Sequence, residues 1–446
     1  MKKDFFNLKD LESQLNRVFY VKNTSFSAVR LLFLKYIVDN FIGAETKEDM
    51  QYYARLQRQL AARDVGGGPN LLYPVLSCVD KYYKLNGVIS SSIEEYASEL
   101  FDLDSSLRRK TASLEGYERI MDVLSRFDLE ENNDDHTKGA IIVEELLTSI
   151  QLRGFNNRMV SQYLSRKELG EIASGILNVQ DGETFLDFTA GAGSTTFAIV
   201  NNKKCRVINC DNQEENATIA AMLCIMKGYE NFSIRYEDTL ASSAFKLRAD
   251  KIFVDAPIGL RVDNLGLGLK MESSLIAIDK TIEALNENGL GIVTVNNGVL
   301  FGASKYQIET KKNLIENKYL KAVVSLPICM FGTSVNINMF VVSKQENRGV
   351  LFVNGNSKVF AKYILKEKVK GNILTGEGVE FIINLVTKNQ SLEEISRVVS
   401  FVEIEENNYN LMPNTYVKEK IEEESITIEE IDSELEKLYA QLGIKK

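Results

Sequence analysis

The chain has 446 residues, of which 44% are hydrophobic, so it is long enough for two or three domains around a large core. Its net charge of −9 argues against a protein that grips a nucleic acid duplex alone, because phosphate binding requires clustered Lys and Arg. Five cysteines without a CxxC pair, and a single histidine, His136, in a polar stretch, argue against a zinc site and against histidine-based acid–base chemistry.

The N-terminal sequence MKKDFFNLKDLE lacks the apolar stretch of a signal peptide, and we find no run of about 18 apolar residues that could span a membrane. The sequence therefore predicts a cytoplasmic protein without membrane contact.

The first part of the chain has the pattern of an α-helical domain. Residues 1–128 show helical periodicity, as in SFSAVRLLFLKYIVDNF, interrupted by a loop at GGGP, residues 66–69. Residues 129–138, LEENNDDHTK, are acidic and rich in amides, which predicts a linker.

From residue 139 to residue 400 the pattern is that of a second domain. Helical segments alternate there with short apolar runs, which is typical of a parallel α/β sheet covered by helices on both faces. The runs expected to form strands are FLDF, CRVINC, KIFVDA, LGIVTV, KAVVSL and MFVVSK.

The remaining residues, 401–446, end in an acidic helix with an apolar stripe. Its members, spaced three and four residues apart, are Ile428, Ile431, Leu435, Leu438 and Leu442. Such a stripe requires a facing surface, which is either a helix of a partner or the body of this chain.

The segment ETFLDFTAGAGSTTFA predicts a strand, a glycine loop and a helix, a common site for a ligand. Gly191 and Gly193 let the backbone approach a ligand, and the helix N-terminus offers unpaired N–H groups. Asp187 ends the first strand, and Asp211 ends the next, where doubly wound sheets bind a ribose. A dinucleotide and S-adenosylmethionine both fit, but Thr196 stands where GxGxxG needs glycine, which favours S-adenosylmethionine.

Two further acids follow predicted strands, namely Asp238 after FSIRY and Asp255 after KIFV. The order of these pieces resembles the adenine-specific DNA methyltransferases, and in particular the M (modification) subunits of type I restriction-modification systems. The resemblance covers most of the chain. It also includes VSQYLSRKELGEIASGIL, NCDNQEENATIAAMLCIMKGY, LNENGLGIVTVNNGVLFG, NLIENKYLKAVVSLPICMFGTSVNINMFVVSK and ENNYNLMPNTYV.

The resemblance implies a Rossmann-like class I methyltransferase sheet of the α/β class, with an N-terminal α-helical domain and a C-terminal helical tail. It also implies S-adenosylmethionine as cofactor and no metal. By resemblance, Asp187, Gly191 and Gly193 would line the methionine part of the cofactor. Asp211 would bind the ribose, and Asp238 would accept a hydrogen bond from the adenine amine of the cofactor. Each carboxylate also has a structural interpretation, because Asp commonly caps strand-to-helix turns.

A third group, Tyr163, Leu164 and Ser165, would close over the methionine end of the cofactor by the same resemblance. The family has Thr-Pro at the end of this segment, whereas this chain has Ser165 and Arg166. This difference from the family sequence lies in the part of the predicted site that would bind the cofactor.

The catalytic loop of the family reads Asn-Pro-Pro-aromatic, and here the four positions are Asp255, Ala256, Pro257 and Ile258. In the family the first side chain and the next carbonyl accept hydrogen bonds from the target amine, and the aromatic ring stacks on the flipped base. Asp255 and the Ala256 carbonyl keep these acceptors. Ile258 loses the stacking, worth roughly 1–3 kcal/mol per base, so we expect base capture to be weaker by about tenfold to a hundredfold.

The sequence thus predicts an adenine-specific DNA methyltransferase subunit, with site recognition delegated to a separate specificity subunit. The resemblance implies DNA, the specificity subunit and a restriction subunit as partners, with two copies of this chain per specificity subunit and residues 401–446 in partner contact. One alternative is a degenerate, non-catalytic paralogue that binds only cofactor or partner, because the loop reads Asp-Ala-Pro-Ile. Another is a methyltransferase that acts on a protein glutamine or an RNA base.

Overall fold

The structure is a computed structural model. It describes residues 7–18, 24–62, 69–93, 122–131, 137–156, 165–201, 203–241, 246–257, 259–263, 270–329, 334–367 and 371–418, and the single residues 120, 435 and 438. Among the sequence predictions, those for His136, Tyr163, Leu164 and Ile258 lie outside the described residues, as do the glycines of the GGGP stretch.

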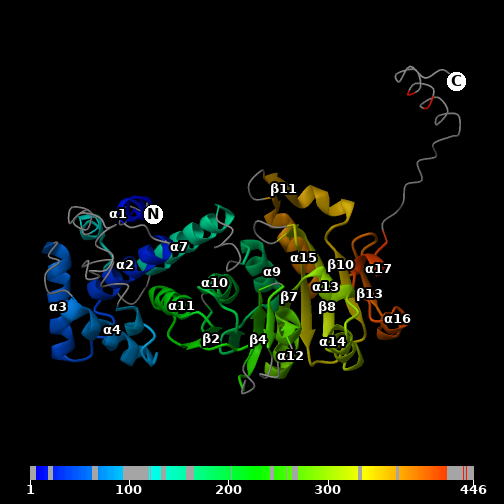
Figure 1. Cartoon of the computed structure of the whole chain (residues 1–446), viewed down its shortest axis with the longest axis horizontal. Coiled ribbons are helices and arrows are strands. Elements are labelled where there is room, and N and C mark those ends of the chain that lie inside the picture. Colours follow the sequence, from blue (N-terminus) through cyan, green and yellow to red (C-terminus); the bar gives the residue numbers. More distant parts are fainter. Residues whose placement is uncertain are drawn as a thin grey trace.

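The first part of the chain is helical, as expected, and lies at one end of the molecule (Figure 1). Its elements are α1 (Leu8–Val18), α2 (Thr24–Asp39), α3 (Lys47–Ala62), α4 (Pro69–Tyr83), the short 3₁₀ helix η1 (Ser90–Ser92) and α7 (Thr137–Asn156). Helix α2 is the centre of this part, because α1, α3 and α7 all pack against it. Its residues from Phe26 to Leu34 are buried, which accounts for the apolar character of its sequence.

The described residues of the predicted linker are held against α2. The Asn40 side chain donates to the Leu129 carbonyl at 2.8 Å and accepts from the Glu131 backbone N–H at 2.7 Å. The Glu131 carboxylate in turn accepts from the backbone N–H groups of Lys138 and Gly139 at the start of α7. These bonds connect the two ends of the linker, while the domain boundaries themselves stay a prediction.

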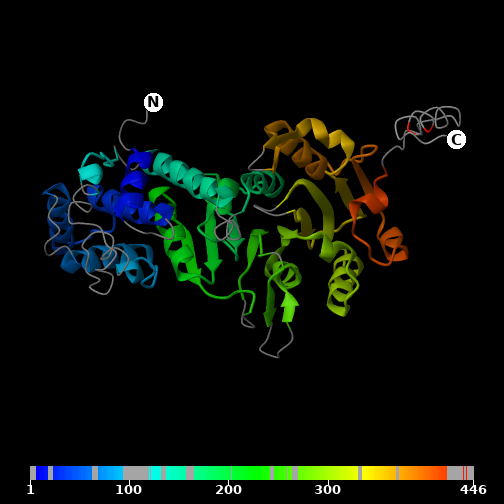
Figure 2. The same ribbon diagram turned by 45° about the horizontal axis from the view of Figure 1, so that its top comes forward.

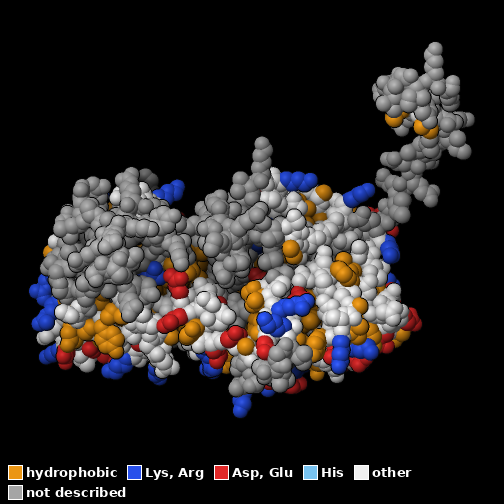
Figure 3. All heavy atoms as spheres, in the orientation of Figure 1, with side chains coloured by type: hydrophobic (Ala, Val, Ile, Leu, Met, Phe, Trp, Pro, Cys, Tyr) orange, Lys and Arg blue, Asp and Glu red, His pale blue; other side chains and the backbone are white. Residues whose placement is uncertain are grey.

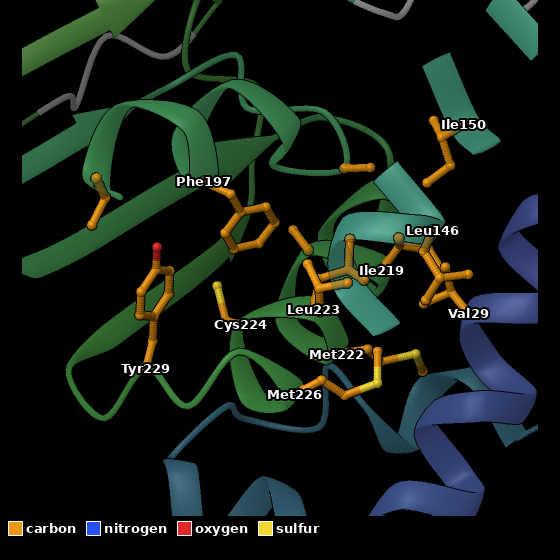
Figure 4. Close-up of a cluster of buried hydrophobic side chains, with 14 of the residues drawn as sticks. Val29, Leu146, Ile150, Phe197, Ile219, Met222, Leu223, Cys224, Met226 and Tyr229 are labelled. Carbon is orange, nitrogen blue, oxygen red and sulfur yellow. The ribbon is translucent and has the colours of Figure 1, made fainter. Parts of the chain in front are cut away.

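Helix α11 (Glu214–Met226) joins the helical part to the sheet. Its residues from Ala217 to Met226 are all buried, because the helix packs on β2 and β3 on one side and on α2 and α7 on the other. Figure 4 shows Ile219 of α11 beside Leu146 of α7 and Val29 of α2 in this shared core. At the rim of the contact, Arg30 pairs with Glu215 at 3.2 Å.

Among the described residues, nine strands form the central sheet (Figures 1 and 2). In spatial order they are β13 (Ser396–Val399), β10 (Val350–Asn354), β8 (Leu320–Cys329), β9 (Asn336–Ser343), β7 (Leu285–Val295), β4 (Ala249–Val254), β1 (Thr184–Asp187), β2 (Arg206–Asp211) and β3 (Phe232–Tyr236). All six apolar runs predicted as strands are strands, which confirms that part of the fold prediction.

The sheet is mixed: most of its pairs are parallel, as expected, and two strands run antiparallel to their neighbours. β9 runs antiparallel between β7 and β8, and β13 runs antiparallel to β10 at the edge. β9 follows β8 after a short connection, which can join antiparallel neighbours but is too short for the crossover that parallel strands need. The other pairs, β10 with β8 and those from β7 through β4, β1 and β2 to β3, are parallel.

Two hydrophobic cores cover the two faces of the sheet, as predicted. Successive strand residues alternate between them, so that Phe185 belongs to one core and Leu186 to the other. The first core includes α9 (Lys167–Leu177), α10 (Ser194–Val200), α11, η3 (Lys358–Tyr363) and α15 (Gly376–Thr387). The second includes α12 (Ser273–Ala284), α13 (Asn297–Phe301), α14 (Lys305–Glu316), α16 (Phe401–Glu406) and α17 (Pro413–Tyr416).

Two small hairpins lie outside the central sheet. One is β5 (Arg261–Asp263) with β6 (Lys270–Glu272), between β4 and α12, and the other is β11 (Ile364–Glu367) with β12 (Gly371–Leu374). The first hairpin directly follows the predicted catalytic loop.

Part of the segment ENNYNLMPNTYV packs on the sheet of this chain, and its contact with a partner stays a prediction. The ring of Tyr416 packs on Phe352 of β10 with centroids 4.4 Å apart, and Leu411 and Val417 are buried in the same core. Of the apolar stripe in the last helix, Leu435 and Leu438 are described and exposed, and the other members lie outside the described residues.

The surface charge is mixed on one face of the molecule, and the described residues show neither a membrane-spanning helix nor a metal-binding group. On the face drawn in Figure 3, Lys and Arg side chains lie interspersed with Asp and Glu and form no continuous basic strip over the coloured surface. Within the described residues, no helix combines the length and apolarity needed to cross a membrane, and no group of three His, Cys, Asp or Glu is arranged to hold a metal.

Candidate active site

The carboxyl ends of neighbouring strands bring most of the predicted site residues to one edge of the sheet. Asp187 is the last residue of β1, Asp211 is the last residue of β2, and Asp255 directly follows β4. Because β4, β1 and β2 are adjacent and parallel, the three acids lie side by side, at the edge where open α/β sheets bind ligands.

The glycine loop connects β1 to α10 with two residues in the left-handed region. Gly191 has φ 55° and Gly193 has φ 85°, backbone conformations that favour glycine. A Cβ on Gly193 would lie 3.0 Å from the ring of Phe197, so both the conformation and the space require glycine there. The loop is thereby shaped for close approach of its backbone to a ligand.

Asp187 is only 2% exposed and lies at the base of this loop. Its Oδ1 accepts a hydrogen bond from the Thr189 backbone N–H at 3.0 Å. Burial raises the pKa of this carboxyl to about 8, and the nearby charges of Asp255 and Asp211 also raise it. A cationic ligand beside Asp187 would lower this pKa and favour the ionised form.

Asp211 holds the glycine loop and the start of α11 at the same time. Its Oδ2 accepts from the Gly191 N–H at 2.9 Å, and its Oδ1 accepts from the Gln213 N–H at 2.8 Å and from the Asn216 side chain at 3.1 Å. Burial raises the pKa of Asp211 as well. Asp211 therefore has a structural role at the strand-to-helix turn. Its half-buried carboxylate also lies beside the glycine loop, where a ligand would bind.

Asp238 lies two residues beyond β3, further along the same edge, and is exposed. Its Oδ1 accepts from the Ala241 N–H at 3.0 Å, which caps the following turn. The structure therefore groups Asp187, Asp211 and Asp255, and leaves Asp238 on the flank of this group.

Asp255, the first residue of the predicted catalytic loop, is held by three hydroxyl side chains. Ser165 donates to Oδ2 at 2.5 Å, and Thr294 near the end of β7 donates to Oδ1. The Asp255 backbone N–H donates to Thr189 Oγ1 at 3.1 Å. Burial raises the pKa of Asp255, and the bonds from Ser165 and Thr294 oppose this effect.

The next two loop residues differ in exposure. Ala256 is buried, whereas Pro257 is exposed and its carbonyl accepts from Ser273 Oγ at 2.7 Å. Ser273 is the first residue of α12, so the loop is attached to that helix.

Arg166 occupies the position where the family has proline, and it is buried. Its guanidinium pairs with Glu168 at 2.7 Å and donates to the carbonyls of Cys329 at 3.1 Å and Asn372 at 2.9 Å. The side chain thus ties the segment before α9 to β8 and β12. Ser165, the preceding residue, is brought to Asp255, while its predicted role toward the cofactor stays a prediction.

Three residues at this site were missed by the sequence analysis, namely Thr189, Ser273 and Thr294. Thr189 stands within the glycine motif, and its position between Asp187 and Gly191 is a signal that could have drawn attention to it. Thr294 is a hydroxyl residue near the end of an apolar strand, and Ser273 is the first residue of a helix. Neither position by itself indicates an active site.

Replacing Gly193 with alanine should destabilise the protein and weaken ligand binding at the loop. The left-handed backbone costs about 1–2 kcal/mol for a residue with a Cβ, and the contact with Phe197 adds to this cost. Gly182→Ala is the matched control, since Gly182 has φ 83° but no atom within 4 Å of the added Cβ. Urea unfolding should show a larger loss for Gly193→Ala, and equal losses would contradict the predicted crowding.

Comparison with known proteins gives a consistent family relationship. A model of the N-6 DNA methylase family matches residues 152–425, which is more than half of the chain. The type I restriction enzyme MjaVIII methylase subunit of Methanocaldococcus jannaschii is 23% identical over 307 residues, which cover 61% of this chain and 52% of that relative. The MjaIX methylase subunit of the same organism is 30% identical over 168 residues, which cover 34% and 29%. The chain therefore matches about half, or less, of the length of these curated relatives.

Solved structures share the fold over nearly the whole chain. The type I restriction-modification system methyltransferase subunit from Streptococcus thermophilus has a TM-score of 0.74 at 17% identity, covering 93% of this chain and 98% of that one. A chain solved to explain complex assembly and conformational transition of the type I R-M system has a TM-score of 0.66 at 16% identity, covering 98% and 95%.

Proposed function

Because the chain belongs to the N-6 DNA methylase family, we propose that it is the M subunit of a type I restriction-modification system. It transfers a methyl group from S-adenosylmethionine to the exocyclic amine of adenine in DNA. The observation that carries this proposal is the link between the predicted cofactor acid and the predicted catalytic loop. Thr189 donates its backbone N–H to Asp187 and accepts the backbone N–H of Asp255 on its hydroxyl.

The residues of the loop fit S-adenosylmethionine, which when bound supplies an electrophilic methyl group. The buried Asp187 can ionise when a positively charged ligand lies beside it, because the ligand lowers its raised pKa. Gly191 and Gly193, both at positive φ, would adjoin its methionine part, and Asp211 and Asp238 would bind its ribose and adenine. Tyr163, Leu164 and Ser165 are proposed to close over the methionine end, as the family resemblance implies.

The target amine would be bound by the acceptors of the loop, Asp255 and the Ala256 carbonyl. The lone pair of an exocyclic amine is delocalised into the ring, so two acceptors on its protons direct that lone pair toward the methyl group. The base has to leave the duplex to reach this buried edge. Orientation, rather than an acid or base with a pKa near 7, is the main contribution of these residues.

Partners follow from the same proposal. A specificity subunit selects the DNA site, a restriction subunit joins the complex, and two copies of this chain bind each specificity subunit. The mixed charge on the face in Figure 3 supports such a division, because partners would add to the positive field that DNA binding requires. The exposed Leu435 and Leu438 are available for partner contact.

One observation favours the second candidate, a non-catalytic paralogue that binds only cofactor or partner. Both oxygens of Asp255 already accept hydrogen bonds from within the chain, and Ile258 replaces the aromatic residue of the family loop. A carboxylate can accept about four hydrogen bonds, however, so these contacts leave room for an amine. We therefore keep methyl transfer as the proposal.

Replacing Ile258 with phenylalanine should raise the rate of DNA methylation by the assembled complex about tenfold. An aromatic ring stacks on a flipped base with roughly 1–3 kcal/mol, more than an aliphatic side chain provides. The assay is incorporation of labelled methyl groups into DNA at subsaturating DNA concentration, with Ile258→Leu as the aliphatic control. Equal rates for the phenylalanine and leucine variants would contradict the assignment of this position.

The cofactor site is tested by calorimetric titration of the protein with S-adenosylmethionine. We expect micromolar binding that is lost in Asp211→Ala and partly kept in Asp211→Asn, which retains one oxygen for the Gly191 N–H. Absence of binding, both to the chain alone and to its complex with the specificity subunit, would overturn the proposal. Binding without turnover in that complex would support the non-catalytic paralogue.

A further inference from the structure

Two hydroxyl side chains from distant parts of the chain hold Asp255, one on each carboxylate oxygen. Ser165 Oγ donates to Oδ2 at 2.5 Å, and Thr294 Oγ1 donates to Oδ1. A hydroxyl has one proton to donate, and both residues use it on this acid. The orientation of the carboxylate is therefore determined by two fixed donors, while lone pairs remain on both oxygens.

Each donor is itself held in place by the fold. Thr294 is fully buried on β7, whose Val293 pairs with Val254, the residue before Asp255. Ser165 precedes the buried Arg166, whose guanidinium is bound to two main-chain carbonyls and to Glu168. Thr294 thus lies on a buried strand, and Ser165 directly precedes a buried, hydrogen-bonded arginine.

The backbone of the loop is restrained in the same way. Thr189 Oγ1 accepts the Asp255 N–H, and Ser273 Oγ donates to the Pro257 carbonyl at 2.7 Å. This loop has one proline fewer than the family sequence Asn-Pro-Pro-aromatic, and hence one fewer residue with a fixed φ angle. Hydroxyl contacts on both sides of Ala256 supply restraint that a second proline ring would otherwise give.

We propose that Ser165 and Thr294 are positioning residues for methyl transfer, whose hydroxyls fix the plane of the Asp255 carboxylate so that its free lone pairs meet the target amine. This inference rests on the proposed function of the site. It assigns Ser165 a role on the catalytic loop, in addition to the cofactor end, and it gives Thr294 a role in the reaction.

Thr294 offers a matched pair of variants, because valine keeps the shape without the hydroxyl and serine keeps the hydroxyl without the methyl group. In the complex with the specificity subunit, Thr294→Val should lower kcat for DNA methylation by about tenfold to a hundredfold, since small misplacement of a reacting group has effects of this size. Thr294→Ser should restore kcat to within about threefold of the wild type. Cofactor affinity, measured by calorimetry, should be the same in all three proteins.

The substrate for this assay is genomic DNA from a strain that lacks the gene, which carries unmethylated sites. Equal kcat for Thr294→Val and the wild type would overturn the inference alone, because the wild type then shows that the site methylates DNA. A fall in kcat that serine fails to restore would also overturn it, since the hydroxyl would then be irrelevant. An inactive wild-type complex that binds cofactor would overturn the proposed function, and the inference with it.

Ser165 gives an independent check from the other oxygen. Ser165→Ala should lower kcat, and Ser165→Thr, which keeps the hydroxyl, should restore it. Urea unfolding of Ser165→Ala and Thr294→Val separates positioning from folding. A loss of kcat confined to conditions under which the variants unfold would mean that the hydroxyls serve the fold alone, and would overturn the inference.

Discussion

Replacing Asp255 with alanine is expected to lower the rate of DNA methylation by a factor of roughly 10²–10³, the usual effect of removing one positioned polar group from an active site. Asp255 is the side-chain acceptor that the proposal assigns to the target amine. Its removal also leaves the hydroxyls of Ser165 and Thr294 without their acceptor. The measurement is the single-turnover rate of the complex with the specificity subunit on unmethylated DNA.

The control for this variant is Asp255→Asn, which keeps one oxygen and the shape of the side chain. Its rate should lie between those of the wild type and the alanine variant, and both variants should bind S-adenosylmethionine within about threefold of the wild type, since Asp255 is not assigned to the cofactor. An alanine variant as active as the wild type would show that the target amine binds elsewhere.

Replacing Asp187 with asparagine should stabilise the cofactor-free protein at pH 8. The pKa of Asp187 is raised to about 8 by burial, so the folded protein keeps this proton while the unfolded chain loses it above pH 4. Stability from this group is therefore complete below about pH 4 and declines as the pH rises toward 8. Asparagine carries no ionisable proton, so the variant escapes this decline.

The expected gain in unfolding free energy at pH 8, relative to the gain at pH 5, is on the order of 4 kcal/mol. Urea unfolding of both proteins at the two pH values measures it directly. The same substitution should weaken binding of S-adenosylmethionine by about tenfold, because asparagine cannot ionise beside a cationic ligand. Parallel pH profiles for the two proteins would contradict a buried, protonated Asp187.

Much of the site could be predicted from sequence because its residues follow local rules. Asp187, Asp211 and Asp255 each come at or just after the end of an apolar run, and the carboxyl ends of neighbouring parallel strands share an edge of the sheet. Gly191 and Gly193 stand where the backbone takes positive φ. These features depend on a few consecutive residues, and their order along the chain carried the family resemblance.

The contacts that hold the catalytic loop could not be predicted, because they join residues far apart in the chain. Ser165 meets Asp255 across 90 positions of sequence, and Arg166 reaches a carbonyl on β12 across 206. A single serine or threonine has no pattern that distinguishes such a contact from an ordinary surface hydroxyl. Only the strand order places Thr294 of β7 beside β4.

Two further features, the direction of β9 and the packing of residues 411–417, also depend on parts of the chain outside the segments themselves. The apolar run of β9 has the composition of a parallel core strand, and its direction is decided by the short connection to β8 rather than by its residues. The aromatic and apolar residues of ENNYNLMPNTYV are suited to any apolar surface. Leu411, Tyr416 and Val417 are buried on the sheet of this chain, where Tyr416 meets Phe352 of β10.

The most direct measurement is mass spectrometry after incubation with S-adenosylmethionine and the assembled complex. Nucleosides are analysed from DNA and RNA, and peptides are analysed from protein. The account predicts N6-methyladenine in DNA, formed by the wild type and far more slowly by Asp255→Ala, and no methylation of RNA or protein. Methylated glutamine or RNA bases without N6-methyladenine in DNA would contradict it, and so would a complex that binds cofactor and methylates none of the three.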